Sequence, residues 1–414
     1  MTCRFCNAEL DAPFLDLGMH PSANRLLNKG LLDQINSGPL VEPRTALRLQ
    51  VCSNCWLVQL SEFTQPDEIF TDEYVYFSSY AKSWVEHARQ YVDTVRKRFG
   101  LDSRSWVVEV ASNDGYLLQH FIENGIPCTG VDPAGNAATE AEARGVETIV
   151  DFFSLGFATK LVEQRGKADL VLGNNVLAHV PTINDFVAGL HQLLKPSGVV
   201  TMEFPHLARL VELTQFDTIY DEHYFYFSLM AVQKIFLHHG LDVFDVEQLS
   251  THGGSLRIFA KHVDNEDLSV SENVAAITAI EKSLGIDQLA TYTALQQRSD
   301  AIRTEFKAFI GRAQAEGKSI AAFGAAAKGN TFLNYCVVGH DSIKLVADDT
   351  PIKQGRFLPG SHIPIVPEQE LRELQPDYVV ILPWNFREEI AGKLSYIREW
   401  DGKFVTCIPQ VEIW

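Results

Sequence analysis

The sequence predicts an α/β protein with an N-terminal metal-binding lobe followed by two Rossmann-like units. Strands and helices begin to alternate near Ser105, and a similar alternation returns near Ser319. The strand segments are apolar runs with little alternation, as is typical of parallel strands covered on both faces. Four cysteines lie in the first 55 residues, ahead of both units. A chain of 414 residues is long enough for two or three domains.

The composition limits the partners of the protein. The net charge is -18 and the sequence pI is about 5.1. Binding along a nucleic-acid backbone needs a basic face, so we expect no nucleic-acid partner. No apolar run approaches the roughly 18 residues of a membrane span, and residues 1–6 do not resemble a signal peptide. We therefore expect a cytoplasmic protein that is a monomer or a small homo-oligomer.

The first segment carries two cysteine pairs, each with the spacing C-x-x-C. The pairs are Cys3 with Cys6 and Cys52 with Cys55. Four thiolates suit a closed, tetrahedral structural zinc site, because they leave no open position for catalysis. Disulfides or idle thiols are the alternative. Residues 7–51, which contain several Pro and Gly, are predicted to be an irregular loop with little core.

An aromatic stretch, residues 74–80, precedes a predicted helix over residues 82–99. Tyr76 is the candidate in this stretch for a lid over a ligand site. Aromatic packing between domains is the alternative interpretation.

The pattern in the middle of the chain predicts a doubly wound sheet. Apolar strand segments recur between stretches of helical pattern, which is the order of such a sheet. The predicted strands are 106–110, 126–131, 147–150, 168–172 and 199–204, with 241–246 and 252–260 as closing antiparallel strands.

The turn after the first of these strands identifies the class of ligand. A dinucleotide-binding turn needs G-x-G-x-x-G, and those glycines are mostly missing here. The turn instead resembles the acidic-x-Gly-x-Gly-x-Gly turn of S-adenosylmethionine methyltransferases. Its four positions are occupied by Glu109, Ala111, Asn113 and Gly115. We assign these residues to cofactor binding.

Polar side chains follow the next strands in the order that such a cofactor needs. Asp132 ends the second strand, where an acid would accept from the ribose hydroxyls. Asp151 and Phe152 follow the third strand and would meet the adenine. Asn174 and Asn175 follow the fourth and would face the methionine moiety. Taken singly, each could be an ordinary polar group at a strand end; together they indicate S-adenosylmethionine.

A second polar cluster, residues 220–227, follows the fifth strand and would lie over the methyl donor. His223 is the candidate general base, because histidine titrates near neutral pH. Glu222 would orient His223 or a substrate hydroxyl. Tyr220, Tyr76 and His179 are candidates for steadying a developing oxyanion. The alternative is an aromatic segment that packs a dimer or domain seam.

The last part of the chain begins with helical sequence and continues as a second α/β unit. After the strand at 319–323, the turn 324–331 imitates a phosphate-binding loop. Asn330 occupies the position of the phosphate-binding lysine, so an NTPase is rejected. A turn of small residues that feeds a helix N-terminus can still bind a phosphate or diphosphate. Packing alone is the alternative reason for its small residues.

The motifs in this order resemble a known family, the sugar C-methyltransferases of bacterial deoxysugar pathways. The resemblance covers nearly the whole chain. It rests on the cysteine pairs and the segments 109–115, 174–179, 220–223, 252–257, 324–330 and 353–355. It implies a structural zinc, S-adenosylmethionine in the middle domain, and a nucleotide-linked sugar between the middle and C-terminal domains. The substrate-binding candidates are His252, Lys328, Asn330, Asn334 and Lys353.

The resemblance also implies the domain limits and the reaction. We expect a zinc-binding domain over residues 1–67, a methyltransferase domain over 68–262 and a substrate-binding α/β domain over 263–414. The implied reaction is methyl transfer to C-3 of a nucleotide-linked 4-keto-6-deoxy sugar. A C–H next to a ketone can be removed by a well-placed base, and the enolate carbon then attacks the sulfonium methyl group. The alternatives are an O- or N-methyltransferase for another small metabolite and a zinc-stapled binding protein without catalysis.

Overall fold

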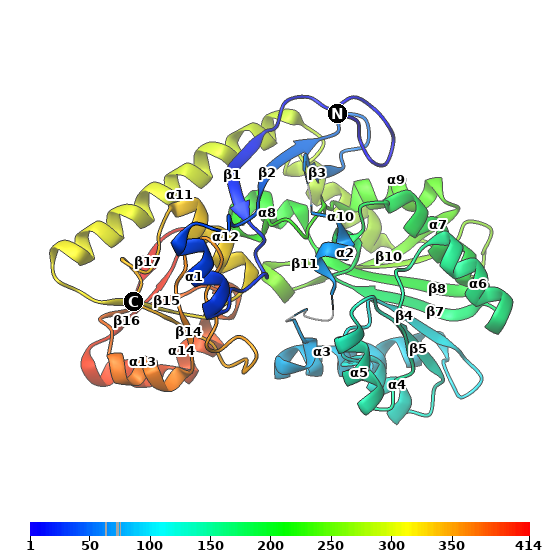
Figure 1. Cartoon of the computed structure of the whole chain (residues 1–414). Helices are drawn as coiled ribbons and strands as arrows, with labels where there is room; N and C mark the ends of the chain where they lie inside the picture. The colour runs from blue at the N-terminus through cyan, green and yellow to red at the C-terminus, as the bar shows by residue number, and fades with distance from the viewer. Residues whose placement is uncertain (63, 72–73, 75) are drawn as a thin grey trace.

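The computed structural model describes residues 1–62, 64–71, 74 and 76–414, and these residues form three β-sheets. Figure 1 shows the N-terminal sheet between two larger α/β units. The predicted α/β architecture, with an N-terminal lobe and two Rossmann-like units, is confirmed.

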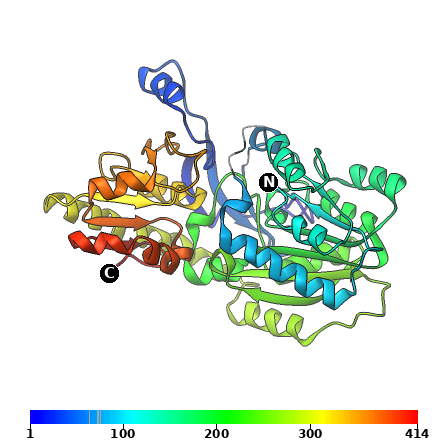
Figure 2. The same cartoon turned by 90° about the horizontal axis from the view of Figure 1, so that it is seen from below.

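The N-terminal lobe is more ordered than the sequence predicts. Its sheet has the order β1 (Leu15–Pro21), β2 (Arg44–Val51), β3 (Val58–Leu60) and β9 (Phe225–Tyr226). The prediction of an irregular loop over residues 7–51 is therefore wrong. Alternating leucines in β1 and β2, such as Leu15, Leu17, Leu47 and Leu49, are buried in a common core. The Pro and Gly residues instead fall mainly in the connection around α1 (Lys29–Ser37), which reaches away from the sheet on an arm (Figure 2).

The middle unit contains the doubly wound sheet. Its spatial order is β10 (Leu241–Leu249), β11 (Ser255–His262), β8 (Leu194–Pro205), β7 (Ala168–Asn174), β4 (Val107–Val110), β5 (Cys128–Val131) and β6 (Thr148–Ile149). The five strands from β8 to β6 pair in parallel, while β11 is antiparallel to both β8 and β10. Because β4 and β7 are central, the turns that follow them lie at the middle of the carboxyl edge, where open α/β sheets bind ligands.

Helices cover both faces of this sheet. The helices of this part of the chain are α2 (Pro66–Ile69), α3 (Lys82–Phe99), α4 (Leu118–Glu123), α5 (Gly135–Ala143), α6 (Leu155–Arg165), α7 (Ile183–Leu193), α8 (Leu207–Leu213), α9 (Leu229–His238) and α10 (Glu272–Ser283). Of these, α8 packs in the core shared with the N-terminal lobe and the C-terminal unit. Although α10 lies beyond residue 262, it packs on the middle unit. Its buried Glu281 accepts backbone hydrogen bonds from Leu229 and Met230 and contacts His206 at 2.7 Å. This carboxylate satisfies free N–H groups at the N-terminus of α9.

The C-terminal unit has a second, mostly parallel sheet. Its order is β14 (Ile365–Val366), β13 (Val346–Ala347), β12 (Ile320–Phe323), β15 (Tyr378–Ile381), β16 (Lys403–Thr406) and β17 (Glu412–Ile413). Its helices are α11 (Leu289–Ala315), α12 (Ala327–Cys336), α13 (Glu368–Leu374) and α14 (Arg387–Lys393). One buried core joins this unit to the N-terminal lobe and to α8, for example through Phe332, Leu47 and Leu207. This shared core therefore fixes the positions of the N-terminal lobe, α8 and the C-terminal unit relative to one another.

Candidate active site

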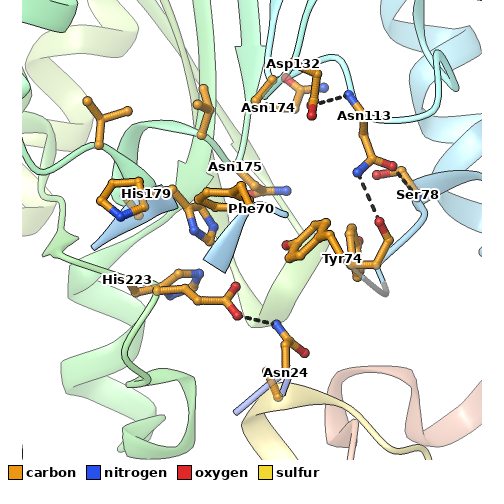
Figure 3. A pocket seen from close by; sticks show the side chains of 18 of the residues that line it. Asn24, Phe70, Tyr74, Ser78, Asn113, Asp132, Asn174, Asn175, His179 and His223 are labelled. Carbon is orange, nitrogen blue, oxygen red and sulfur yellow. Dashed lines mark hydrogen bonds between the residues drawn. The ribbon is translucent and has the colours of Figure 1, made fainter. Parts of the chain in front are cut away.

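A cavity of about 680 Å³ lies where the three parts meet, at the carboxyl edge of the middle sheet. Ala111, Asp132 and Asn174 line it from the middle unit, Lys328 lines it from the C-terminal unit, and Asn24 lines it from the N-terminal lobe. Figure 3 shows that the labelled side chains, including Asn24, surround one space.

The turn after β4 has the backbone geometry of a glycine-rich turn. Ala111 has φ +57°, Asn113 has φ +50° and Gly115 has φ +74°. A Cβ on Gly115 would lie 2.9 Å from Cγ2 of Val146, so this position requires glycine. Ala111 and Asn113 adopt a left-handed conformation that costs a non-glycine residue roughly 1 kcal/mol, and such strain often marks functional sites.

Hydrogen bonds join this turn to the end of β5. The backbone N–H of Asn113 donates to Oδ2 of Asp132 at 2.8 Å, and that of Ala134 donates to Oδ1 at 2.9 Å. Burial raises the pKa of Asp132 to about 6, while the two N–H groups oppose this shift. The carboxylate is thus held at the cavity wall with lone pairs left for ligand hydroxyls.

The other cofactor-binding candidates divide into two groups. Asp151, Phe152 and Asn174 line the cavity together with Ala111, Asn113 and Asp132. Glu109 and Gly115 lie outside this set of described lining residues. Glu109 is fully buried within β4, and burial raises its pKa well above the usual range.

The stretch before α3 lies across the turn from Glu109 to Gly115, called the cofactor turn below. Asn113 accepts a hydrogen bond from the backbone N–H of Ser78 at 2.8 Å and donates to the carbonyl oxygen of Tyr76 at 3.1 Å. Asn136 donates to the carbonyl oxygen of Tyr74 at 2.9 Å (Figure 3 labels Tyr74). Tyr76 is 43% exposed and lines the cavity, and its role as a lid stays a prediction. Val75, in the predicted aromatic stretch, lies outside the described residues.

His223 lies in the cavity wall with its ring orientation fixed. Its Nδ1 lies 3.2 Å from the carbonyl oxygen of Thr218. A carbonyl oxygen only accepts, so Nδ1 carries the proton and Nε2 keeps a free lone pair. The ring of Tyr220 lies 4.0 Å from that of His223, centroid to centroid, and the ring of His179 lies 4.7 Å away. Burial, followed by the charge of His179, lowers the pKa of His223 well below its usual value, so the ring is neutral at pH 7.

The three remaining catalytic candidates also line this part of the cavity. They are Glu222, Tyr220 and His179. Burial raises the pKa of Tyr220 well above 10 and lowers that of His179 to about 4. Both side chains are therefore neutral near pH 7, and the Tyr220 hydroxyl keeps its proton.

Asn24 is a cavity residue that sequence reasoning missed. Its side-chain amide donates to Oε1 of Glu222 at 3.0 Å, across 198 residues of sequence (dashed in Figure 3). Phe70, Tyr74 and Trp84 were missed as well and also line the cavity, as does Asn175, which the sequence places next to Asn174. The aromatic stretch was a signal for Tyr74, but no local pattern marks Asn24.

Two lysines reach the cavity from the C-terminal unit. The ammonium group of Lys328 donates to Oδ1 of Asn385 at 2.8 Å and lies 4.9 Å from the centre of the Trp384 ring. Lys353 donates to the carbonyl oxygen of Ala325 at 2.9 Å. Ala326 and Ala327, at the N-terminus of α12, line the same end of the cavity. Two cations beside a helix N-terminus make this end suitable for an anion.

The other three substrate candidates differ in placement. His252 lines the cavity, and its Nε2 lies 3.1 Å from the side-chain nitrogen of Asn175. Asn330 and Asn334 are not among the described lining residues. Asn334 donates to the carbonyl oxygens of Asn330 at 2.9 Å and of Pro359 at 3.1 Å, so it holds a neighbouring loop.

The four cysteines of the N-terminal lobe form one cluster. The Sγ atoms of Cys3, Cys6, Cys52 and Cys55 all lie within 4.8 Å of one another. The Cys3–Cys55 and Cys6–Cys52 separations are 3.6 and 3.5 Å. Zinc–sulfur bonds of about 2.3 Å in a tetrahedron place sulfurs about 3.8 Å apart, so the cluster fits zinc. All four thiols are free, so the alternative of a pair of disulfides is not found in the structure.

The fold and site together define a class of protein. A methyltransferase-type turn and an acid after the second strand lie at one cavity, with a zinc-binding lobe beside it. Family models match in the same order: a zinc binding domain over residues 3–70, a methyltransferase domain over 84–246 and a C-methyltransferase C-terminal domain over 250–409. The protein is a methyltransferase that uses S-adenosylmethionine and contains zinc.

A full-length relative gives the family. The chain is 36% identical over 411 residues to C-methyltransferase NovU of Streptomyces niveus, covering 99% of this chain and 96% of that protein. The chain therefore belongs to the C-methyltransferase family. It is also 30% identical over 96 residues to the ubiquinone biosynthesis O-methyltransferase of Bordetella avium (strain 197N), covering 23% of this chain and 40% of that protein.

Two solved structures are similar to part of the chain, each with a low TM-score. The PH0226 protein of Pyrococcus horikoshii OT3 covers 45% of this chain and 95% of its own, with 17% identity and a TM-score of 0.38. Magnesium protoporphyrin IX methyltransferase (ChlM) of Synechocystis PCC 6803, with bound SAM, covers 43% of this chain and 80% of its own, with 18% identity and a TM-score of 0.32.

In the described part of the chain, no helix is both long and apolar enough to span a bilayer.

Proposed function

We propose that the protein methylates C-3 of a nucleotide-linked 4-keto-deoxysugar, in deoxysugar biosynthesis, through an enolate. One observation carries the proposal. A single cavity joins a cofactor turn, a neutral histidine with a free Nε2, and a cationic end that suits a diphosphate. A C-methyltransferase needs a carbon acid as its acceptor, and a C–H next to a ketone is one.

The cationic end would hold the substrate. Lys328 and Lys353 lie where a diphosphate would gain from their charges and from the N–H groups of α12. The nucleotide would then lie toward the C-terminal unit, and the sugar would extend toward His223. Binding energy from the remote nucleotide would position the reacting carbon.

His223 would act as the base. Its Nε2 takes the proton from C-3, and the electrons of the broken C–H bond move into the C-3–C-4 bond as negative charge develops on the C-4 oxygen. Thr218 keeps the other ring nitrogen protonated and so fixes the tautomer. S-adenosylmethionine supplies the methyl group that the C-3 carbanion then attacks.

The enolate oxygen needs a hydrogen-bond donor. Tyr220 is the candidate that stays protonated beside His223, because burial raises its pKa. Tyr76 and His179 line the same wall and are further candidates. Preorganised donors of this kind stabilise charge as it develops. Glu222 would accept a hydrogen bond from a sugar hydroxyl; among the described contacts, the imidazole of His223 is held by Thr218 rather than by Glu222.

The test compares matched nucleotide sugars. The enzyme, with methyl-labelled S-adenosylmethionine, is given a 4-keto-6-deoxy sugar nucleotide and the corresponding 4-hydroxy compound. Methylation of the keto compound alone, with the label on carbon, supports the proposal. Label on oxygen or nitrogen, or equal use of the 4-hydroxy compound, would instead support an O- or N-methyltransferase.

A further inference from the structure

The zinc lobe contributes a side chain to the loop over residues 220–227, called the catalytic loop below because it carries the proposed base His223. Asn24, three residues beyond the end of β1, donates its amide to Oε1 of Glu222 at 3.0 Å. The backbone N–H of the preceding Ala23 donates to Oδ1 of Asp221 at 3.2 Å. Two adjacent carboxylates of the catalytic loop are thus each hydrogen-bonded by one short stretch of the lobe.

Backbone pairing fixes the position of this contact. Strand β9 begins two residues after His223 and pairs with β3, with Val58 opposite Tyr226. Thr64 donates its hydroxyl to Oδ2 of Asp221 at 3.2 Å, and the hydroxyl of Tyr224 donates to the carbonyl oxygen of Thr64 at 2.9 Å. The catalytic loop therefore forms part of the lobe's own sheet, so the distance from Asn24 to Glu222 depends on the lobe.

We propose that Asn24 is a positioning residue that turns the Glu222 carboxyl group toward the substrate and favours its ionised form. The proposal rests on the function proposed above. It makes the N-terminal lobe a contributor to the substrate site, in addition to any stabilising role of its zinc.

The surroundings of Glu222 disfavour its ionised form, and the amide of Asn24 opposes this effect. The titratable groups that face Glu222 are Asp221, Tyr74, Tyr220, Tyr224 and His179. Burial, followed by the charge of Asp221, raises the pKa of Glu222 to about 8, and the hydrogen bond from Asn24 opposes this rise. Asn24 is the side-chain donor that the described residues supply to this carboxylate. A hydrogen bond to the charged form favours it.

Two variants separate an electrostatic role from a packing role. In Asn24→Ala the donor is lost, and in Asn24→Asp it is replaced by a carboxylate of the same shape. Loss of the hydrogen bond should raise the pKa of Glu222. In a plot of kcat/KM against pH, we therefore expect the rise on the acidic side to move to higher pH by about one unit in Asn24→Ala and further in Asn24→Asp. Binding of S-adenosylhomocysteine should not change. If only the shape matters, Asn24→Asp will behave as wild type and the limb will stay in place, which overturns the proposal.

A second measurement needs no substrate. The free energy of unfolding is measured in urea at pH 6 and pH 9 for wild type and Asn24→Ala. The loss caused by the substitution should be larger at pH 9, where Glu222 is ionised and the hydrogen bond is charge-assisted. Asn28→Ala is the matched control, because Asn28 caps α1 on the same arm and does not line the cavity. The free energy of unfolding that Asn28→Ala loses should be the same at pH 6 and at pH 9.

The outcomes distinguish this inference from the proposed function. A wild-type enzyme that fails on the 4-keto substrate contradicts the proposed function, and the unfolding comparison still decides on Asn24. An active wild type, together with equal losses for Asn24→Ala at both pH values, overturns the role of Asn24 and leaves the proposed function standing.

Discussion

The Nδ1 atom of His223 lies 3.2 Å from the carbonyl oxygen of Thr218, and this contact fixes the proton on one side of the ring. The opposite nitrogen is then a base rather than a donor. Asparagine at position 223 can keep the contact with Thr218 through its amide but has no basic nitrogen. We expect His223→Asn to lower kcat by roughly 10²- to 10⁴-fold, the usual contribution of a general base.

The control for this variant is cofactor binding. His223→Asn should bind S-adenosylhomocysteine with the affinity of wild type in calorimetry, because the cofactor turn is separate from the 220–227 loop. Near wild-type turnover in His223→Asn would contradict the assignment of the base.

Asp132 gives a pH dependence to cofactor binding. Burial raises its pKa to about 6, so the free protein holds this carboxyl protonated at pH 5 and ionised at pH 7.5. The ionised form only accepts hydrogen bonds, and its charge strengthens them, whereas the protonated form carries a proton on one oxygen. We expect affinity for S-adenosylhomocysteine to rise as the pH increases through about 6, as measured by calorimetry. Asp132→Asn should bind more weakly and lose this dependence; a pH-independent wild type would contradict the role of Asp132.

Removal of zinc should disturb the catalytic loop as well as the lobe. Strand β3 begins three residues after Cys55 and pairs with β9, which follows His223. We expect Cys52→Ser, or treatment with a chelator, to lower both the melting temperature and the turnover. The control is Cys128→Ser, since Cys128 lies outside the cluster. A zinc-free protein with a wild-type melting temperature and turnover would contradict this coupling.

The cofactor turn predicts opposite tolerances at two positions. Ala111→Gly relieves a left-handed alanine but gives the unfolded chain more freedom, so stability should change by less than about 1 kcal/mol. Gly115→Ala adds a Cβ 2.9 Å from Val146 at φ +74°, so it should cost more than about 2 kcal/mol. Urea unfolding measures both. Equal effects would show that the turn relaxes freely.

The sequence predicted the parts of the site that depend on local pattern. The C-x-x-C pairs and the turn from Glu109 to Gly115 are short motifs whose chemistry follows from their spacing. Order along the chain also predicted the side chains at the ends of parallel strands, such as Asp132 and Asn174, because these strand ends share one edge of the sheet.

Contacts formed by distant segments could not be predicted in this way. Asn24 reaches Glu222 because β9, only two residues long, joins the sheet of the lobe. A strand this short has no periodicity to detect. The direction of side chains on α12 was also beyond the pattern, since Asn330 is buried and Asn334 holds a loop, while Lys328 faces the cavity.

The central claim is that His223 removes a proton from C-3 of a 4-keto sugar. Its most direct test is proton exchange in D₂O, with S-adenosylhomocysteine in place of the methyl donor and NMR of the C-3 position. Wild type should exchange the C-3 proton of the 4-keto-6-deoxy sugar nucleotide, and His223→Asn should not. Failure of the wild type to exchange this proton while it methylates the same substrate, or undiminished exchange in His223→Asn, would contradict the claim.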